Sequence, residues 1–157
     1  MNYGFINPKH IIEKAEKICD CIGHGKNGTA VEMIVETAIV ETGLGAIEDK
    51  TIGAGMGLTQ FDEKPFEDIK NRNMKLRSKI LKDLGVDISL VHWDDLRYND
   101  FLALLFTRLH YWLKVIQFQK LLKKEQSIGN FTITQKMGKV HLNIILKWIE
   151  DLEFKNE

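Results

Sequence analysis

The chain has 157 residues, of which 44% are hydrophobic and 28% are charged. This length and composition suit one globular domain with its own apolar core. Its 22 basic and 22 acidic side chains cancel, so no net field attracts a polyanion, and we expect no nucleic-acid partner. Charges interrupt each apolar run before it reaches the roughly 20 residues that cross a bilayer. We therefore expect no stable membrane insertion, and we take the protein to act as a monomer.

The first residues, "MNYGFINPKHIIEKAEK", contain no apolar stretch behind a basic start, so the usual secretory signal is not expected. The two cysteines, Cys19 and Cys21, are one residue apart on a predicted helix and point to different faces, which disfavours a disulfide between them. Together with His24 they would make only part of a metal site. We expect neither a metal nor another cofactor.

Two helices are predicted in the first third of the chain. Asn7 caps the first, and Pro8 lies in its first turn, where a missing N–H costs nothing. Gly23 ends this helix. The second is expected to begin at Thr29 with a capping box formed with Glu32, and to end at a glycine in position 43.

The middle of the chain predicts further helices and no paired strands. Pro65 opens a helical stretch of one or two helices that Gly85 closes. Asn99 then caps the segment "NDFLALLFTRLHYWLKV", which is apolar nearly all round and so belongs in the middle of a fold. No alternating strand pattern occurs, and the predicted fold class is mainly α.

Helix geometry separates two glutamates of the second helix as candidate catalytic acids. At about 100° per residue, Glu41 falls within about 20° of Ile34, on the apolar stripe, whereas Glu36 lies roughly opposite and faces water. A carboxyl among apolar groups has its pKa raised by desolvation and keeps a proton near neutral pH. Glu41 is therefore the candidate general acid, although a lone glutamate at a helix end more often pairs with a lysine or caps a backbone.

A glycine-dense loop follows this helix. Gly53, Gly55 and Gly57 allow bare backbone to approach a bulky ligand. Gln60 supplies an amide that can donate to and accept from sugar hydroxyls or acetamido groups, and Asp62 adds a second carboxylate. Glycines are common in turns, so the loop indicates a binding site only when it is considered together with Glu41.

The runs "AIVETGLG" and "GAGMGLTQFD" resemble the soluble lytic transglycosylase and goose-type lysozyme families. In those families a helix ends in Glu-Ser, and a later Gly-Leu-Met-Gln segment lines the sugar cleft. Here Glu41-Thr42 and Gly57-Leu58-Thr59-Gln60 occupy the two positions. The segments "GMGLTQFDEKPFEDI" and "VHWDDLRYNDFLALLFTRLHYWL" look like phage endolysins of the same lysozyme-like superfamily, which extends the likeness from about residue 28 to about residue 115.

This resemblance implies a single lysozyme-like domain over residues 1–116 that cleaves the MurNAc-GlcNAc β-1,4 bond of peptidoglycan glycan strands. It implies that Glu41 is the catalytic acid and that Asp62 stands where goose-type lysozymes hold an acidic residue. The implied substrate-binding residues are Thr42, Met56, Gly57, Leu58 and Gln60. The protein would be made in the bacterial cytoplasm and would reach the cell wall by phage lysis or another export route.

Two reactions share this acid. If Asp62 or Asp49 positions a water opposite Glu41, the result is inverting hydrolysis, which requires carboxyls roughly 6.5 to 9.5 Å apart. Otherwise Glu41 protonates the leaving oxygen and then acts as base while the muramic acid 6-hydroxyl attacks C1. That second route is the transglycosylase reaction that the family implies, and it is slightly favoured here.

The tail, residues 117–157, departs from the family, which continues with a Tyr-Asn segment after its long central helix. Read plainly, the residues Ile144, Ile145, Trp148, Ile149 and Leu152 predict an amphipathic helix. A shifted reading of permitted codons from Gln117 onward instead yields Tyr-Asn and Gly-Lys-Gly segments like those of the endolysins. We therefore expect a frameshift near Gln117, with loose packing of the tail and weak or absent activity.

Two other classes of function compete with the enzyme. A non-catalytic wall-binding or virion structural module could keep this fold without turnover. A helical DNA-binding protein would use basic stretches such as "KNRNMKLRSKILK", but these are more often a solvated helix face. The five histidines lack metal-binding spacing, and the aromatic residues from Trp93 to Trp112 are more often core than sugar contacts.

Overall fold

The computed structural model describes residues 7–25, 28–47, 51, 53–72 and 74–128, and side chains as far as residue 117. Its helices are α1 (Pro8–Ile22), α2 (Thr29–Thr42), α3 (Glu63–Asn71), α4 (Leu76–Leu84), the 3-10 helix η2 (Trp93–Arg97) and α5 (Asp100–Ile128). In these ranges the β-structure consists of one bridge, between Met56 and Phe61. The fold is mainly α, as predicted.

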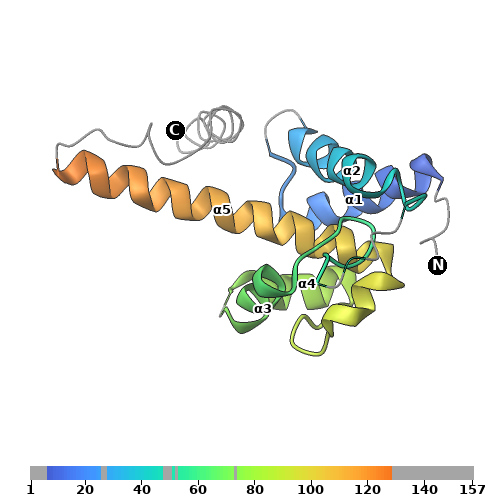
Figure 1. Ribbon diagram of the computed structural model, residues 1–157. Coiled ribbons are helices and arrows are strands. Elements are labelled where there is room, and N and C mark those ends of the chain that lie inside the picture. The colour runs from blue at the N-terminus through green and yellow to red at the C-terminus, as the bar shows by residue number, and fades with distance from the viewer. Residues whose placement is uncertain (1–6, 26–27, 48–50, 52, 73, 129–157) are drawn as a thin grey trace.

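Helix α5 is the centre of the fold. It contacts α1 and α2 on one side and α3 and η2 on the other (Figure 1). All eight residues from 102 to 109 are buried, which confirms the prediction of a central helix. Beyond this stretch α5 projects from the body and continues past Ile116, the predicted end of the domain (Figure 1). Within the described part of the chain, no helix combines the length and apolarity that crossing a bilayer requires.

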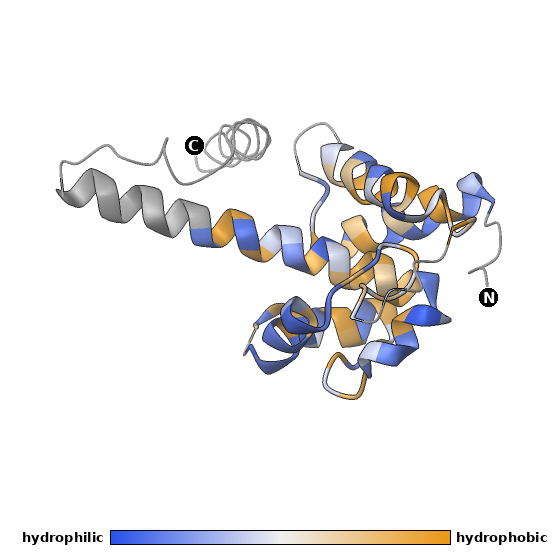
Figure 2. Ribbon diagram, viewed as in Figure 1, coloured by the Kyte–Doolittle hydropathy of each residue, from blue (hydrophilic) through white to orange (hydrophobic). Residues whose placement is uncertain are grey.

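The core surrounds this buried stretch of α5. Figure 2 shows hydrophobic residues concentrated where α5 passes through the body. Phe66 of α3 stacks on Phe106 with ring centroids 4.5 Å apart, and Phe61 meets the same ring edge-on at 6.3 Å. Each fully buried side chain of this size stabilises the fold by roughly 1.5–3 kcal/mol, so the helices are held mainly by their packing on α5.

The ends of α1 and α2 show which of the predicted helix caps the structure uses. The side chain of Asn7 accepts a hydrogen bond from the Lys9 amide at 3.0 Å, and Gly23 follows the last turn of α1, both as predicted. The capping box was wrong: Gly28, not Thr29, caps α2, and no side chain caps it. A glycine already fills the cap position at φ 79°, so the Thr29 hydroxyl lies one residue too far along the chain to cap the helix.

The later helices agree with the prediction except at one boundary. The stretch closed by Gly85 is two helices, and the first begins at Glu63, two residues before Pro65. Gly43 and Gly85 both have left-handed φ values that end α2 and α4. The amphipathic segment predicted around Ile144 lies outside the described residues.

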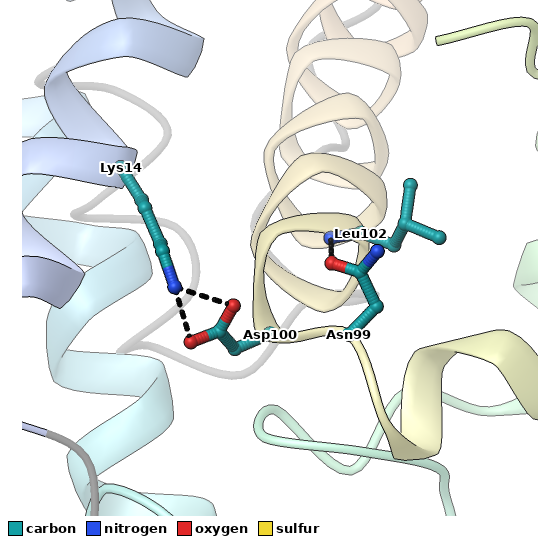
Figure 3. A network of polar contacts seen from close by, with 4 residues as sticks. All are labelled: Lys14, Asn99, Asp100 and Leu102. Carbon is teal, nitrogen blue, oxygen red and sulfur yellow. Dashed lines mark hydrogen bonds and ion pairs between the residues drawn. The ribbon is translucent and has the colours of Figure 1, made fainter.

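Polar contacts fix the start of α5 against α1. The Lys14 ammonium lies 2.7 and 2.6 Å from the two carboxylate oxygens of Asp100 (Figure 3). Asn99 caps α5, because its side-chain oxygen accepts from the Leu102 amide at 3.2 Å (Figure 3). Farther along α5, Arg108 donates to the Gly23 carbonyl at 2.9 Å and so holds the end of α1.

Replacing the cap of α5 should weaken the whole fold. Asn99→Ala removes the acceptor for the Leu102 amide, and the expected loss in the free energy of unfolding is about 1 kcal/mol. Asn99→Ser keeps an acceptor and should stay within a few tenths of a kcal/mol of the unchanged protein. Urea unfolding measures both, and equal stability of the alanine and serine variants would contradict the role of Asn99.

Candidate functional site

Glu41 lies in the last turn of α2 and is exposed. The predicted burial of its carboxyl was wrong, although Ile34 and Ala38, the neighbours from which it was inferred, are fully buried. Burial along α2 follows every fourth residue, through positions 30, 34, 38 and 42. In the last turn the buried face of α2 therefore carries Thr42, and Glu41 is exposed to solvent.

Three exposed apolar side chains occur at the same end of α2 as Glu41. Ile39 and Val40 directly precede it and are 49% and 80% exposed. Ile47 is 65% exposed, and its amide bonds to the Thr42 carbonyl at 2.9 Å, which places it at the same end of α2. Exposed apolar residues gathered at one place often mark a binding surface. Side chains one and two positions apart on a helix point about 100° and 200° away from each other, so Val40 and Ile39 lie on other faces of α2 than Glu41.

Thr42 joins the helix end to the glycine-rich loop. Its hydroxyl is buried and lies 2.7 Å from the Leu58 carbonyl and 3.1 Å from the Ala38 carbonyl. The same oxygen accepts from the Gly45 amide at 3.0 Å. The two segments on which the resemblance rests, Glu41-Thr42 and Gly57–Gln60, are therefore in direct contact in the fold.

The loop from Gly55 to Phe61 is a tight hairpin. Met56 and Phe61 exchange both backbone hydrogen bonds at 2.9 Å. A Cβ at Gly57, where φ is 73°, would lie 2.0 Å from the Leu96 carbonyl oxygen. A Cβ at Gly55 would lie 1.9 Å from the Gln60 carbonyl oxygen. Both glycines are therefore required by close backbone approach.

The predicted substrate contacts divide into buried and accessible residues. Thr42, Met56, Gly57 and Leu58 are buried, so the prediction that these four touch substrate is not supported by their exposure. The side chains of Met56 and Leu58 are buried in the core, and the Thr42 hydroxyl already donates to the Leu58 carbonyl. Gln60 is half-buried with φ 46°, and its amide nitrogen donates to the Gly57 carbonyl at 3.2 Å. The side-chain oxygen of Gln60 is buried, so of this amide only the nitrogen remains to contact a substrate.

Asp62 is exposed, occupies the cap position of α3 and makes no capping hydrogen bond there. It lines a hollow of about 390 Å³ together with His110 of α5. A second hollow, of about 600 Å³, lies between α4 and α5 beside Trp112. Glu41 lines neither of these two hollows. Asp49, the other carboxylate considered for positioning water, lies outside the described residues.

His110 is the residue at this surface that the sequence did not single out. Its ring meets Phe61 edge-on with centroids 5.7 Å apart. Burial lowers the pKa of His110 below its usual value, and the Lys114 ammonium lowers it further, against the opposing charges of Asp68 and Asp62. The imidazole is therefore uncharged at neutral pH and can both donate and accept a hydrogen bond. Its position beside Asp62 depends on long-range packing that no local pattern reveals.

The two cysteines are free thiols and both are buried. Burial raises the pKa of Cys19 and of Cys21, which keeps both as unreactive thiols. Among the described residues, no group of three or more potential metal-ligating side chains is close enough to hold an ion.

No family model, curated protein or solved structure matches this chain.

Removing the Thr42 hydroxyl should separate the helix end from the loop. Thr42→Val keeps the shape but leaves the Leu58 carbonyl and the Gly45 amide without their buried partner, so the free energy of unfolding should fall by about 1–3 kcal/mol. Thr42→Ser retains the hydroxyl and should lose less. Chemical denaturation followed by circular dichroism compares the three proteins, and a valine variant as stable as the unchanged protein would refute this contact.

Proposed function

We propose that this protein is a peptidoglycan-cleaving enzyme of the lysozyme-like superfamily, with Glu41 as its general acid. The observation that supports this most is the 2.7 Å contact between the Thr42 hydroxyl and the Leu58 carbonyl. It brings the residue after the candidate acid onto the loop that carries Gln60. An exposed carboxyl and a nearby amide are groups that a glycan strand would need.

The exposure of Glu41 changes how its proton would be held. A glycan strand lying over Glu41 would exclude water from the carboxyl, so desolvation would come from the bound substrate and not from the protein core. The acid would then be protonated in the complex, where it must donate to the leaving oxygen. Gln60 would hold the strand through its amide.

The reaction would begin when Glu41 transfers its proton to the glycosidic oxygen and the bond from this oxygen to C1 breaks. In the transglycosylase route the muramic acid 6-hydroxyl then attacks C1 and gives its proton back to the Glu41 carboxylate. The product carries a 1,6-anhydro ring and no water is consumed. This route needs one carboxyl only, and it is favoured by the position of Asp62 at a hollow that Glu41 does not line.

Hydrolysis is the second route. Asp62 would then act as base toward a water on the far side of the sugar ring. Its carboxylate is exposed and makes no capping bond, so it is available for this role. The mass of the digestion products separates the routes, because anhydro and reducing ends differ by one water.

The test of the acid compares two glutamates of the same helix. Glu41→Gln should reduce dye release from purified cell walls by at least about 100-fold, the usual contribution of a general acid. Glu36→Gln, also exposed on α2, should behave like the unchanged protein. Equal and measurable release by the Glu41→Gln variant and the unchanged protein would rule out Glu41 as the acid.

A non-catalytic wall-binding or virion structural module is the alternative. It is favoured by one observation, the exposure of Glu41, because the protein itself does not enclose this carboxyl in an apolar site. Binding to walls with negligible dye release from both the unchanged protein and Glu41→Gln would support this module.

We further propose that the reading frame changes near Gln117, so that residues 117–157 are not the segment selected to complete this domain. In support, Trp112, Leu113 and Ile116 line the 600 Å³ hollow beside Met74 and Leu76, at the part of α5 where the resemblance to the family ends.

Resequencing the gene across the codons for Ile116 and Gln117 should show an inserted or missing base. The corrected chain should then have higher dye-release activity than the present one. An unambiguous reading of the present frame, found again in an independent isolate, would end this proposal.

A further inference from the structure

The hollow beside Asp62 differs from the surface around Glu41 in its charge. Its lining contains two carboxylates, two ammonium groups and one imidazole, from the residues Asp62, Lys64, Asp68, His110 and Lys114, and the uncharged side chains of Pro65, Leu113 and Gln117 complete it. Its volume of about 390 Å³ is in the range of small-ligand pockets. An uncharged sugar has no use for charges of both signs, whereas a short zwitterionic peptide does.

Several of these charges are available to a ligand. Lys64 and Lys114 are exposed, and neither forms a salt bridge with another described residue. Asp62 makes no capping hydrogen bond. Asp68, by contrast, is engaged by Arg72, whose Nε donates to it at 2.8 Å. The hollow therefore offers two cations for carboxylates and one carboxylate for an ammonium group.

The hollow is also connected to the proposed glycan site through the backbone. Asp62 follows Gln60 by two residues, and Phe61 between them packs against the His110 ring. The Phe61 carbonyl accepts from the Trp93 indole at 2.8 Å, which fixes this part of the loop. A strand held at Gln60 would thus have its side branches next to the hollow.

We propose that this hollow binds the peptide stem of peptidoglycan, the branch of muramic acid that carries free carboxylates and an amino group. The inference rests on the proposed function, since it assigns the stem to a site beside the glycan strand. Lys64 and Lys114 bind the carboxylates of the stem, Asp62 binds its ammonium group, and the His110 ring forms one wall.

The test measures binding without turnover. The probe is the synthetic tetrapeptide alanine–γ-glutamate–diaminopimelate–alanine, added to the Glu41→Gln protein while the ring-proton resonances of His110 are followed by NMR. The peptide should shift these resonances, and the disaccharide GlcNAc-MurNAc without peptide should shift them less. Absence of a shift at millimolar peptide would overturn the inference.

Charge variants then locate the site. Lys64→Gln combined with Lys114→Gln should weaken the Kd of the tetrapeptide about three- to tenfold, as expected for two exposed ion pairs. Lys75→Gln, a matched exposed lysine that lines the other hollow, should leave the Kd unchanged. Equal effects of the two changes would show that the peptide responds to overall charge and would overturn the inference.

The outcome is separable from that of the proposed function. If the peptide binds at His110 but no protein cleaves cell walls, the enzyme proposal fails and the hollow remains a zwitterionic peptide site. If walls are cleaved through Glu41 but the peptide shifts no His110 resonance, the enzyme stands and the stem site fails.

Discussion

The complete burial of α5 between residues 102 and 109 is the constraint on which the rest of the structure depends. A helix enclosed on every side requires neighbours on every side, and α1, α2, α3 and η2 all supply them. Its two buried polar residues are also positioned for hydrogen bonding: Thr107 lies 2.8 Å from both the Ala103 carbonyl and the Thr59 hydroxyl, and Arg108 donates to the Gly23 carbonyl. Because unpaired buried groups are costly, these contacts also fix where the surrounding segments lie.

The candidate site is built outward from this helix. Thr59 and Phe61 of the hairpin are anchored on α5 through Thr107 and Phe106. Thr42 then attaches the end of α2 to the same hairpin. The exposed groups, Glu41 and Asp62, directly adjoin buried residues, Thr42 and Phe61. Their placement is therefore as rigid as the core, while their functional atoms remain accessible.

Local signals in the sequence predicted the helices well. The Asn7 cap, the Asn99 cap and the central helix follow from patterns that a few adjacent residues contain, and the structure confirms all three. The cap of α2 was predicted one residue late because Thr29 and Glu32 match a capping box, whereas Gly28 already satisfies the backbone geometry.

The site was harder to predict because its properties come from distant contacts. A helical wheel gives the angle of Glu41 but not which segments cover the last turn. Gly57 is required because the carbonyl of Leu96, far along the chain, lies against it. The approach of His110 to Phe61 joins residues 49 positions apart, since 110 − 61 = 49, and no local periodicity encodes it.

The contact between Thr42 of α2 and the loop has a consequence for how this sequence could change in evolution. The hydroxyl at position 42 contacts a main-chain oxygen at position 58, and every amino acid provides that oxygen. Position 58 can thus change to any side chain that fills the core, and position 42 can alternate between threonine and serine, without either change requiring the other. Homologous sequences would show no correlated substitution at this pair, so covariation would miss the contact that holds the two segments together.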